Sequence, residues 1–257
     1  MEEVVVVAAC RTAVGDFGGA LKDVPPTELG ATVVRAVLER GGVPAADVGQ
    51  VVFGHVINTE PRDMYLSRVA SVNAGIPHES VAMNVNRLCG SGLQAIISAA
   101  QAIKLGDTKI AIGAGAESMS RSPYIAPAQR WGARMGDAAL LDMMTGALSD
   151  PFDRVHMGVT AENVAKRYGV TRQDQDELAL ASHQRAENAI KNDYFKSQIV
   201  PVVQKTRKGE VVFDTDEHVR MGATIENFSG LRPVFVKEDG TVTAGNASAI
   251  NDGAGAV

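Results

Sequence analysis

The chain has 257 residues, a net charge of −5 and 21% charged residues, which fits a soluble globular protein of one large domain or two ordinary ones. The acidic balance argues against a general nucleic-acid surface. No run reaches the roughly 18 apolar residues of a membrane span, and the N-terminus lacks a signal peptide's basic region, so we expect a cytoplasmic protein. The two cysteines, Cys10 and Cys89, lack metal-ligand spacing, so we expect reduced thiols and no bound metal.

The first half of the chain alternates between strand and helix patterns. β-Branched residues at 4–9 predict a strand buried on both faces, and apolar residues at helical spacing predict a helix over 27–40. Further strands are expected at 51–56, 81–85 and 109–115, with helices at 65–74 and 93–104. This alternation predicts an α/β fold whose mostly parallel sheet is covered by helices, with ligands beyond the carboxyl ends of the strands.

The alternation breaks after Glu117, where a different region is expected to begin. Helices are predicted at 134–148, 160–168 and 171–194, a hairpin at 199–213 that turns at Lys208-Gly209, and a last strand at 241–248. This region carries several basic residues: Arg207, Lys208, Arg220, Arg232 and Lys237. They form either a solvated face or a site for the phosphates of a ligand.

Cys89 lies where an apolar strand gives way to a helix, in the stretch Leu88-Cys89-Gly90-Ser91-Gly92. The two glycines let the backbone turn sharply and approach a ligand, and Ser91 is a candidate cap for the helix. Free backbone N–H groups at the start of a helix favour a thiolate over a thiol, so Cys89 is a candidate nucleophile. The alternative is that Cys89 is a small buried hydrophobic residue.

No histidine is a convincing partner base for Cys89. His55 ends a predicted strand, where a core or hydrogen-bonded role is expected, whereas His156 precedes a helix and is placed near a ligand. The stretch from Gly113 to Glu117 lacks the third glycine of a dinucleotide fingerprint. The residues alone therefore predict an α/β protein with a cysteine nucleophile and an incomplete site.

Four stretches, at 86–95, 113–120, 156–165 and 240–248, resemble motifs of the thiolase family in order and at the family's spacing. The likeness is to bacterial β-ketothiolases, also called acetyl-CoA acetyltransferases. It runs from Val4 to Val257 and covers the family's N-terminal portion. It implies a fold of two similar halves with a loop domain inserted in the first: a core domain at 1–120, the inserted domain at 121–240, and a return to the core at 241–257.

The resemblance also implies an activity. Cys89 matches the cysteine that accepts an acyl group, in the condensation of two acetyl-CoA to acetoacetyl-CoA or in the CoA-dependent cleavage of a 3-ketoacyl-CoA. Coenzyme A is then a substrate, with no permanently bound cofactor. His156, Met157 and Ser248 match residues that line the pantetheine channel, and Arg220 and Thr224 match positions near the CoA nucleotide. The family also implies a homodimer or homotetramer, with roles in fatty acid metabolism or polyhydroxyalkanoate biosynthesis.

The family's activating histidine, oxyanion asparagine and second catalytic cysteine belong to its other half, so we expect no turnover from these 257 residues alone. Cys10 matches none of them and is expected to be a buried structural thiol. Two alternatives are a noncatalytic protein that binds acyl-CoA or lipid, and a decarboxylating ketoacyl synthase. Both would use a related fold, and the first would carry no acyl group on Cys89.

Overall fold

The computed structural model describes residues 3–207 and 209–257, so Lys208 in the predicted hairpin turn lies outside the described residues. The chain divides into two compact units, which are described separately. Unit 1 comprises the chain through Met143 together with Gln198–Glu217 and Ile250–Val257. Unit 2 comprises Met144–Ser197 and His218–Ala249. The division expected from the sequence, at 120 and 240, stays a prediction.

Unit 1 contains a seven-stranded sheet in the order β4-β3-β5-β11-β1-β8, with β2 paired to β11. Its strands are β1 (Cys10–Thr12), β2 (Gly15–Asp16), β3 (Gln50–Gly54), β4 (Val81–Val85), β5 (Ala111–Ser118), β8 (Ile199–Val200) and β11 (Asn251–Ala256). β3 is parallel to β4 and β5, and β1 is parallel to β8, whereas β11 is antiparallel to β1, β2 and β5. The predicted α/β fold with a mostly parallel sheet is confirmed.

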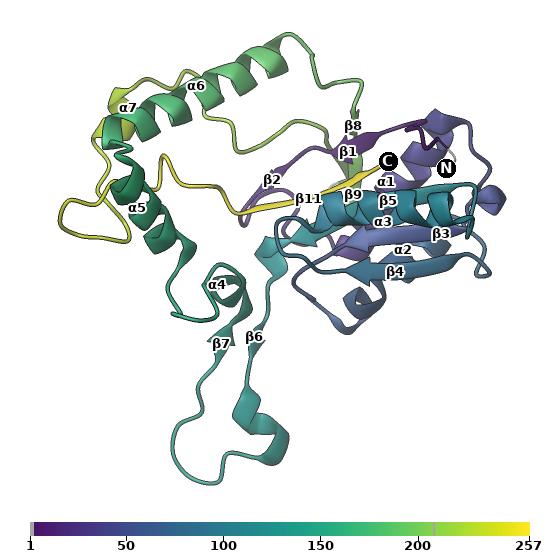
Figure 1. Cartoon of the computed structure of the whole chain (residues 1–257), viewed down its shortest axis with the longest axis horizontal. Helices are drawn as coiled ribbons and strands as arrows, with labels where there is room; N and C mark the ends of the chain where they lie inside the picture. Colours follow the sequence, from purple (N-terminus) through teal and green to yellow (C-terminus); the bar gives the residue numbers. More distant parts are fainter. Residues whose placement is uncertain (1–2, 208) are drawn as a thin grey trace. The chain divides into compact units, whose positions relative to one another are not determined.

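Helices cover both faces of this sheet. α1 (Pro26–Gly41) and α2 (Leu66–Asn73) lie on one face, and α3 (Ser91–Leu105) lies on the other (Figure 1). Neighbouring residues of a strand point to opposite faces. Accordingly, a Cβ on Gly30 of α1 would lie 2.9 Å from the Phe53 ring, whereas a Cβ on Gly54 would lie 2.6 Å from the backbone of Ser91 in α3. The sheet is therefore sandwiched between two helical layers.

The core lies on the side of α1, whose predicted apolar face is confirmed. Leu29, Val33 and Val34 are fully buried together with Phe53 of β3. Gly42 ends the helix in the left-handed conformation, with φ of 60°.

α3 confirms the predicted helix but buries a different face. The sequence pattern placed Leu93 and Ile97 on the apolar face, yet their exposures are 65% and 39%. The alanines Ala95, Ala99 and Ala102 face inward instead. Glycines on the sheet explain the reversal, because a Cβ on Gly113 would lie 2.7 Å from Cα of Ile96, so the helix lies too close to the strands for large side chains.

Two predicted strands are absent from the described residues. The segment 4–9 is irregular, and Val5, Val6 and Val7 are exposed. The pairing of β1 with β11 begins at Cys10 and Ala256 and leaves that segment without a facing strand. The segment 241–248 forms turns, because Thr243 N–H donates to Asn246 Oδ1 and the Thr243 carbonyl accepts from Ala247 N–H. The last strand of the sheet is β11, which begins further along the chain than predicted, at Asn251.

The helix predicted over 134–148 is also wrong for most of its length. Only α4 (Met143–Ala147) is helical there, and β7 (Leu141–Asp142) pairs with β6 (Tyr124–Ile125). Gly136 has a φ of 91°, a left-handed conformation that interrupts a helix. The predicted hairpin is confirmed by β9 (Val202–Thr206) and β10 (Gly209–Phe213), which pair from Thr206 and Gly209 onward.

Unit 2 is built from α5 (Met157–Tyr168), α6 (Arg172–Lys191) and α7 (Glu226–Ser229). The capping box that opens α6, between Thr171 and Asp174, is confirmed. Glu162 of α5 accepts hydrogen bonds from the backbone N–H groups of Thr241 and Val242 and from the Thr241 hydroxyl, at 2.7 to 2.9 Å. One buried carboxylate therefore fastens the loop before β11 to α5.

Among residues 3–207 and 209–257, no helix has the length and apolar character that a membrane crossing requires. Within the same ranges there is no group of three or more histidine, cysteine or acidic side chains arranged to hold a metal ion.

Candidate active site

Cys89 is exposed at the point where β4 gives way to α3, beyond the carboxyl end of the strand. Leu88, immediately before it, has a φ of 46° in the left-handed region. A residue other than glycine costs about 1 to 3 kcal/mol there and persists only where its surroundings hold it. The turn thus presents the sulfur to solvent from a constrained backbone.

The Ser91 side chain stabilises this turn through two hydrogen bonds. Its hydroxyl accepts from Arg87 N–H at 2.8 Å and donates to the Leu88 carbonyl at 2.6 Å. The expectation that Ser91 caps α3 is wrong, because Gly90 occupies the cap position and Ser91 is the first helical residue. The buried Ser91 side chain closes the turn instead of capping the helix.

Gly54 allows the turn to lie close to the sheet. Gly54 at the end of β3 pairs with Gly115 of β5. A Cβ on Gly54 would lie 2.6 to 2.7 Å from backbone atoms of Ser91 and Gly92, whereas one on Gly115 would make ordinary contacts. The first turn of α3 therefore lies directly on the carboxyl end of β3.

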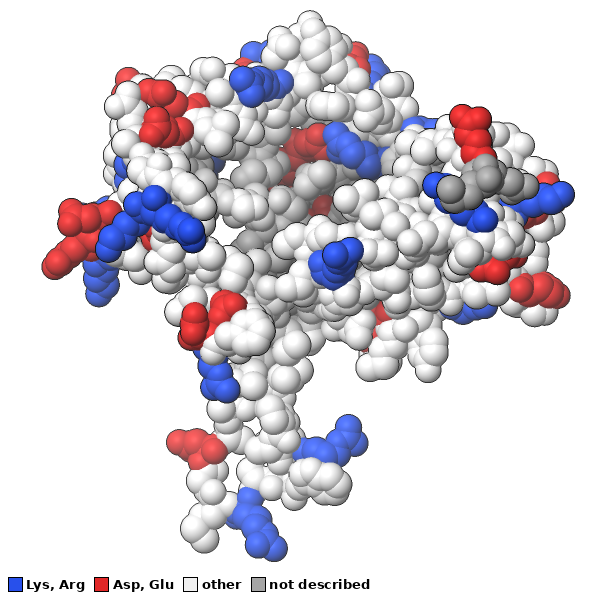
Figure 2. Space-filling model, viewed as in Figure 1, with Lys and Arg blue, Asp and Glu red and all other residues white. Residues whose placement is uncertain are grey.

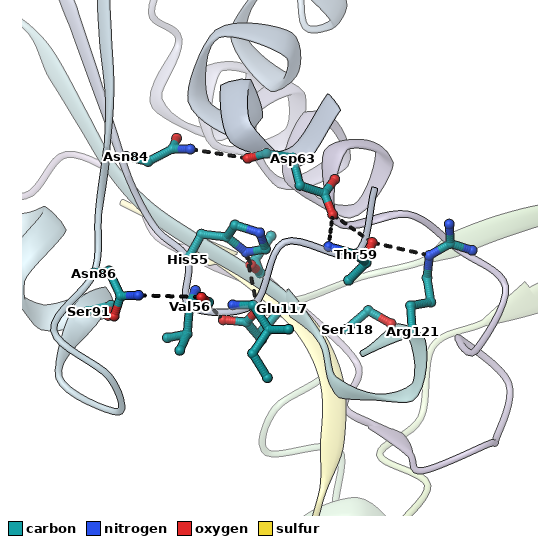
Figure 3. A network of polar contacts seen from close by, with 12 residues as sticks. His55, Val56, Thr59, Asp63, Asn84, Asn86, Ser91, Glu117, Ser118 and Arg121 are labelled. Atoms are coloured by element: carbon teal, nitrogen blue, oxygen red, sulfur yellow. Dashed lines mark hydrogen bonds and ion pairs between the residues drawn. The ribbon is translucent and has the colours of Figure 1, made fainter. Parts of the chain in front are cut away.

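A network of buried polar groups lies under this turn (Figure 3). His55, 4% exposed, follows β3, and its Nδ1 lies 2.9 Å from the Ala116 carbonyl and 3.2 Å from Glu117 Oε1. Both neighbours are acceptors, so Nδ1 carries a hydrogen. The expectation that His55 is a hydrogen-bonded core residue is confirmed.

The charges around His55 oppose the effect of its burial. Burial disfavours the imidazolium, but the hydrogen bond and charge of Glu117, the Ala116 carbonyl and the charge of Asp63 outweigh it and raise the pKa of His55. His55 Nε2 and Asp63 Oδ1 are buried without a hydrogen-bond partner among the described residues. Asp63 Oδ2 accepts from the backbone and hydroxyl of Thr59.

Glu117 and Asn86 connect this network to the turn. The Glu117 carboxylate accepts from Val56 N–H at 2.8 Å and Ile57 N–H at 3.1 Å. The Asn86 side chain donates to the Val56 carbonyl at 3.3 Å and accepts from Leu88 N–H at 3.1 Å. A continuous series of hydrogen bonds thus runs from Glu117 to the residue before Cys89.

Cys10 is buried, whereas Cys89 is exposed. It is 6% exposed, and its sulfur donates to the Val33 carbonyl at 3.3 Å. Burial raises the pKa of the Cys10 thiol, opposed by the charge of Arg40. The expected structural role of Cys10 is confirmed, and Cys89 is the exposed thiol of the two.

The other predicted site residues belong to unit 2. His156 precedes α5, accepts from Gly158 N–H through Nδ1 and stacks on the Phe235 ring with centroids 4.7 Å apart. Met157 is the first residue of α5 and is exposed. Arg220, Thr224 and Ser248 are exposed as well.

The structure brings Arg220 close to His183 of α6. Arg220 N–H donates to His183 Nδ1 at 3.2 Å. Burial, together with the charges of His218 and Arg220, lowers the pKa of His183.

On the visible face of the molecule basic and acidic side chains are interspersed rather than gathered by sign (Figure 2).

Cys89 is exposed in a strained turn, at the amino end of a helix and the carboxyl end of a parallel strand. In an α/β protein, this is the geometry of a thiol nucleophile. Residues 4–257 match the thiolase N-terminal domain. The chain belongs to the thiolase family.

Two curated relatives come from Cupriavidus necator. The chain is 70% identical over 255 residues to beta-ketothiolase BktB, covering 99% of this chain and 65% of that protein. It is 51% identical over 259 residues to an acetyl-CoA acetyltransferase, covering 100% of this chain and 65% of the relative. The chain thus spans about 65% of the length of these relatives.

Solved structures share the fold. A Bacillus anthracis acetyl-CoA acetyltransferase superimposes with a TM-score of 0.93 at 45% identity, covering 98% of this chain and 64% of that one. Human mitochondrial 3-ketoacyl-CoA thiolase in complex with CoA gives a TM-score of 0.92 at 40% identity, covering 98% and 63%. These likenesses bear out the fold expected from the sequence.

Proposed function

We propose that this protein is a thiolase in which Cys89 carries the acyl group between two thiols. The observation that carries the proposal is the exposed Cys89 in its strained turn, in contrast to the buried Cys10. Membership of the thiolase family and the names of the relatives support the same activity.

In the first half-reaction the Cys89 sulfur attacks the carbonyl of acetyl-CoA. A bond forms between Cys89 Sγ and the acetyl carbon, the bond from that carbon to the CoA sulfur breaks, and the thiol proton passes to the departing CoA sulfur. In the synthetic second half, the carbanion of another acetyl-CoA, formed by loss of a Cα proton to a base, attacks the thioester. Acetoacetyl-CoA leaves, and Cys89 is released as the thiolate.

The same cycle in reverse consumes a 3-ketoacyl-CoA. Cys89 attacks the ketone carbon, the bond between that carbon and the Cα breaks, and the acyl group stays on sulfur while acetyl-CoA leaves after protonation of its Cα. The thiol of CoA then takes the acyl group from Cys89. Dividing the exchange through a thioester replaces one difficult step by two easier ones.

The backbone N–H of Cys89 suits the oxyanion formed during the attack. No acceptor for this N–H is present among residues 3–207 and 209–257, whereas the N–H groups of Gly90 and Ser91 are bonded to Arg87 and Leu88 carbonyls. A donor aimed at a developing oxyanion contributes roughly 2.7 to 4 kcal/mol.

Unit 2 would supply the CoA contacts. His156, Met157 and Ser248 are assigned to the pantetheine arm, and Arg220 and Thr224 to the nucleotide. The stacking of His156 on Phe235 and the exposure of the Arg220 side chain support the assignment. Acyl-CoA is a substrate rather than a resident cofactor. We further place the protein in the cytoplasm, as an assembly of two or four chains.

The experiment is incubation of the purified protein with acetyl-CoA, followed by mass analysis of the peptides that contain each cysteine. We expect an acetyl group on Cys89 and none on Cys10, and none at all in the Cys89→Ser variant. Cys10 is an internal control, since the same reagent meets both thiols. Binding of acetyl-CoA without acetylation of Cys89 would point to a noncatalytic binder and refute the proposal.

A further inference from the structure

A buried imidazole and a half-buried carboxylate lie at the carboxyl ends of β3 and β5, and the acyl-transfer chemistry proposed above makes no use of them. Only 2% of the His55 side chain and 27% of the Glu117 side chain are exposed. His55 directly follows β3, and Glu117 is the penultimate residue of β5. Hydrogen bonds connect both groups to the turn before Cys89.

The Val56 peptide is held on both sides. Its N–H donates to Glu117 Oε2 at 2.8 Å, and its carbonyl accepts from Asn86 Nδ2 at 3.3 Å. Glu117 also accepts from Ile57 N–H, so its two oxygens are committed to two successive peptides. The position of Val56 is therefore fixed relative to β5 on one side and to the strand-to-helix turn on the other (Figure 3).

Asn86 links Val56 to the turn that carries Cys89. Its Oδ1 accepts from Leu88 N–H at 3.1 Å, and Leu88 is the residue with the left-handed φ. Such a conformation persists where neighbouring groups over-determine it. The Ser91 hydroxyl holds the Leu88 carbonyl and the Asn86 amide holds its N–H, so the Leu88 backbone is fixed at both ends and sets the direction of Cys89.

His55 orients Glu117. The hydrogen on Nδ1 faces both the Ala116 carbonyl and Glu117 Oε1, so it limits rotation of the carboxylate. Asn84, two residues before Asn86, makes similar bonds that lead elsewhere: its Nδ2 donates to the carbonyls of Asp63 and Met64, and its Oδ1 accepts from Ser67 N–H. Both asparagines therefore bond to backbone groups through Nδ2 and Oδ1. Of the two, Asn86 bonds to the turn before Cys89, through Leu88 N–H.

We propose that Glu117, oriented by His55, is a positioning residue for Cys89 and acts through Val56 and Asn86. The inference rests on the proposed function, since it gives these residues a part in acyl transfer by Cys89. A purely structural role would affect stability and leave the alignment of the sulfur unchanged.

The test compares Asn86→Asp with Asn84→Asp in the purified protein. Each variant keeps the Oδ1 acceptor and loses the Nδ2 donor, so the chemical change is matched. Three quantities are measured: the rate of Cys89 acetylation at saturating acetyl-CoA, the rate of Cys89 alkylation by iodoacetamide, and the urea midpoint of unfolding. We expect acetylation by Asn86→Asp to slow on the order of 100-fold, the effect of displacing a reacting group by about 1 Å. Alkylation should change far less, because iodoacetamide needs an accessible thiolate rather than an aligned one.

Asn84→Asp should lower the urea midpoint and leave acetylation at the wild-type rate. Glu117→Gln should slow acetylation as Asn86→Asp does, because the amide NH2 opposes one of the two peptide N–H groups. His55→Asn should restore most of the rate lost in His55→Ala, because the asparagine amide keeps a donor where Nδ1 lies.

Equal acetylation rates for Asn86→Asp and Asn84→Asp would overturn the positioning role. Equal losses of acetylation and alkylation in Asn86→Asp would overturn it as well, since they indicate general disruption of the turn. Failure of the wild-type protein to acetylate Cys89 would instead remove the proposed function, and the positioning role with it, so the two failures are distinct.

Discussion

Replacement of Gly54 by alanine tests how closely α3 must lie on the sheet. The new Cβ would lie 2.6 Å from the Ser91 carbonyl carbon and 2.7 Å from Gly92 N. Both are backbone atoms in the first turn of α3, so no side chain can rotate to make room. Restoring an ordinary separation of about 3.4 Å requires the turn to move by about 0.8 Å.

That displacement has two expected costs. Overpacking of this kind lowers the free energy of unfolding by about 1 to 3 kcal/mol. The same movement displaces Cys89, and a reacting group displaced by about 1 Å loses on the order of 100-fold in rate. Urea unfolding measures the first cost, and the rate of Cys89 acetylation measures the second.

Two alanine variants on β5 are the controls. Gly115 faces Gly54 across the sheet, but its Cβ would make ordinary contacts of 3.4 and 3.8 Å, so Gly115→Ala should keep wild-type stability. Gly113→Ala should destabilise the fold through Ile96, a turn further along α3, with a smaller effect on Cys89. If Gly54→Ala proved as stable and reactive as Gly115→Ala, the close approach of α3 would not determine the geometry of the site.

Two further predictions concern buried ionisable groups. Because the pKa of His55 is raised, its contribution to stability is fully present below its unfolded-state value of about 6.5 and is lost as the pH rises through the folded-state pKa. Urea unfolding across this range should therefore show the wild type losing stability relative to His55→Asn as pH increases, and a parallel pH dependence in both proteins would contradict the assignment. Glu162→Gln should destabilise unit 2 by about 1 to 3 kcal/mol, because one of its backbone donors then faces an amide NH2. Amide exchange at Thr241 and Val242 reports this loss, with the exposed Glu177→Gln on α6 as control, and unchanged protection would refute it.

The sequence was sufficient to predict the features that depend on local residue patterns. The strand, glycine and helix signals around Cys89 placed the cysteine correctly at the start of α3, and the apolar spacing over 27–40 predicted the buried face of α1. These signals are carried by the residues that form the element. At these two places, the glycine spacing and the hydrophobic period predicted the structure correctly.

Features that depend on distant partners could not be predicted in the same way. The buried face of α3 is decided by Gly54 and Gly113, which lie on other strands, so the pattern of α3 itself misled. The link from Glu117 to Val56 joins residues separated by 61 positions. Glu117 could have been flagged only as a carboxylate at the end of a strand beside the cysteine turn.

Local backbone geometry was the other source of error. Nothing in a leucine signals the left-handed conformation of Leu88, since glycine or asparagine is the usual residue there. The turns at 241–248 are likewise stabilised by Thr243 and Asn246, whose side chains compete with strand pairing. In both places a side chain outside the hydrophobic pattern determines the backbone.

The left-handed Leu88 has a consequence for attempts to stabilise this protein. Glycine would adopt the same backbone conformation without the steric penalty, and strained positions of this kind are natural targets for thermostability engineering. The penalty at Leu88, however, accompanies the restriction that fixes the neighbouring sulfur. Relieving it would exchange a rigid nucleophile for a more stable fold, so this is a position where selection for heat resistance and selection for turnover pull in opposite directions.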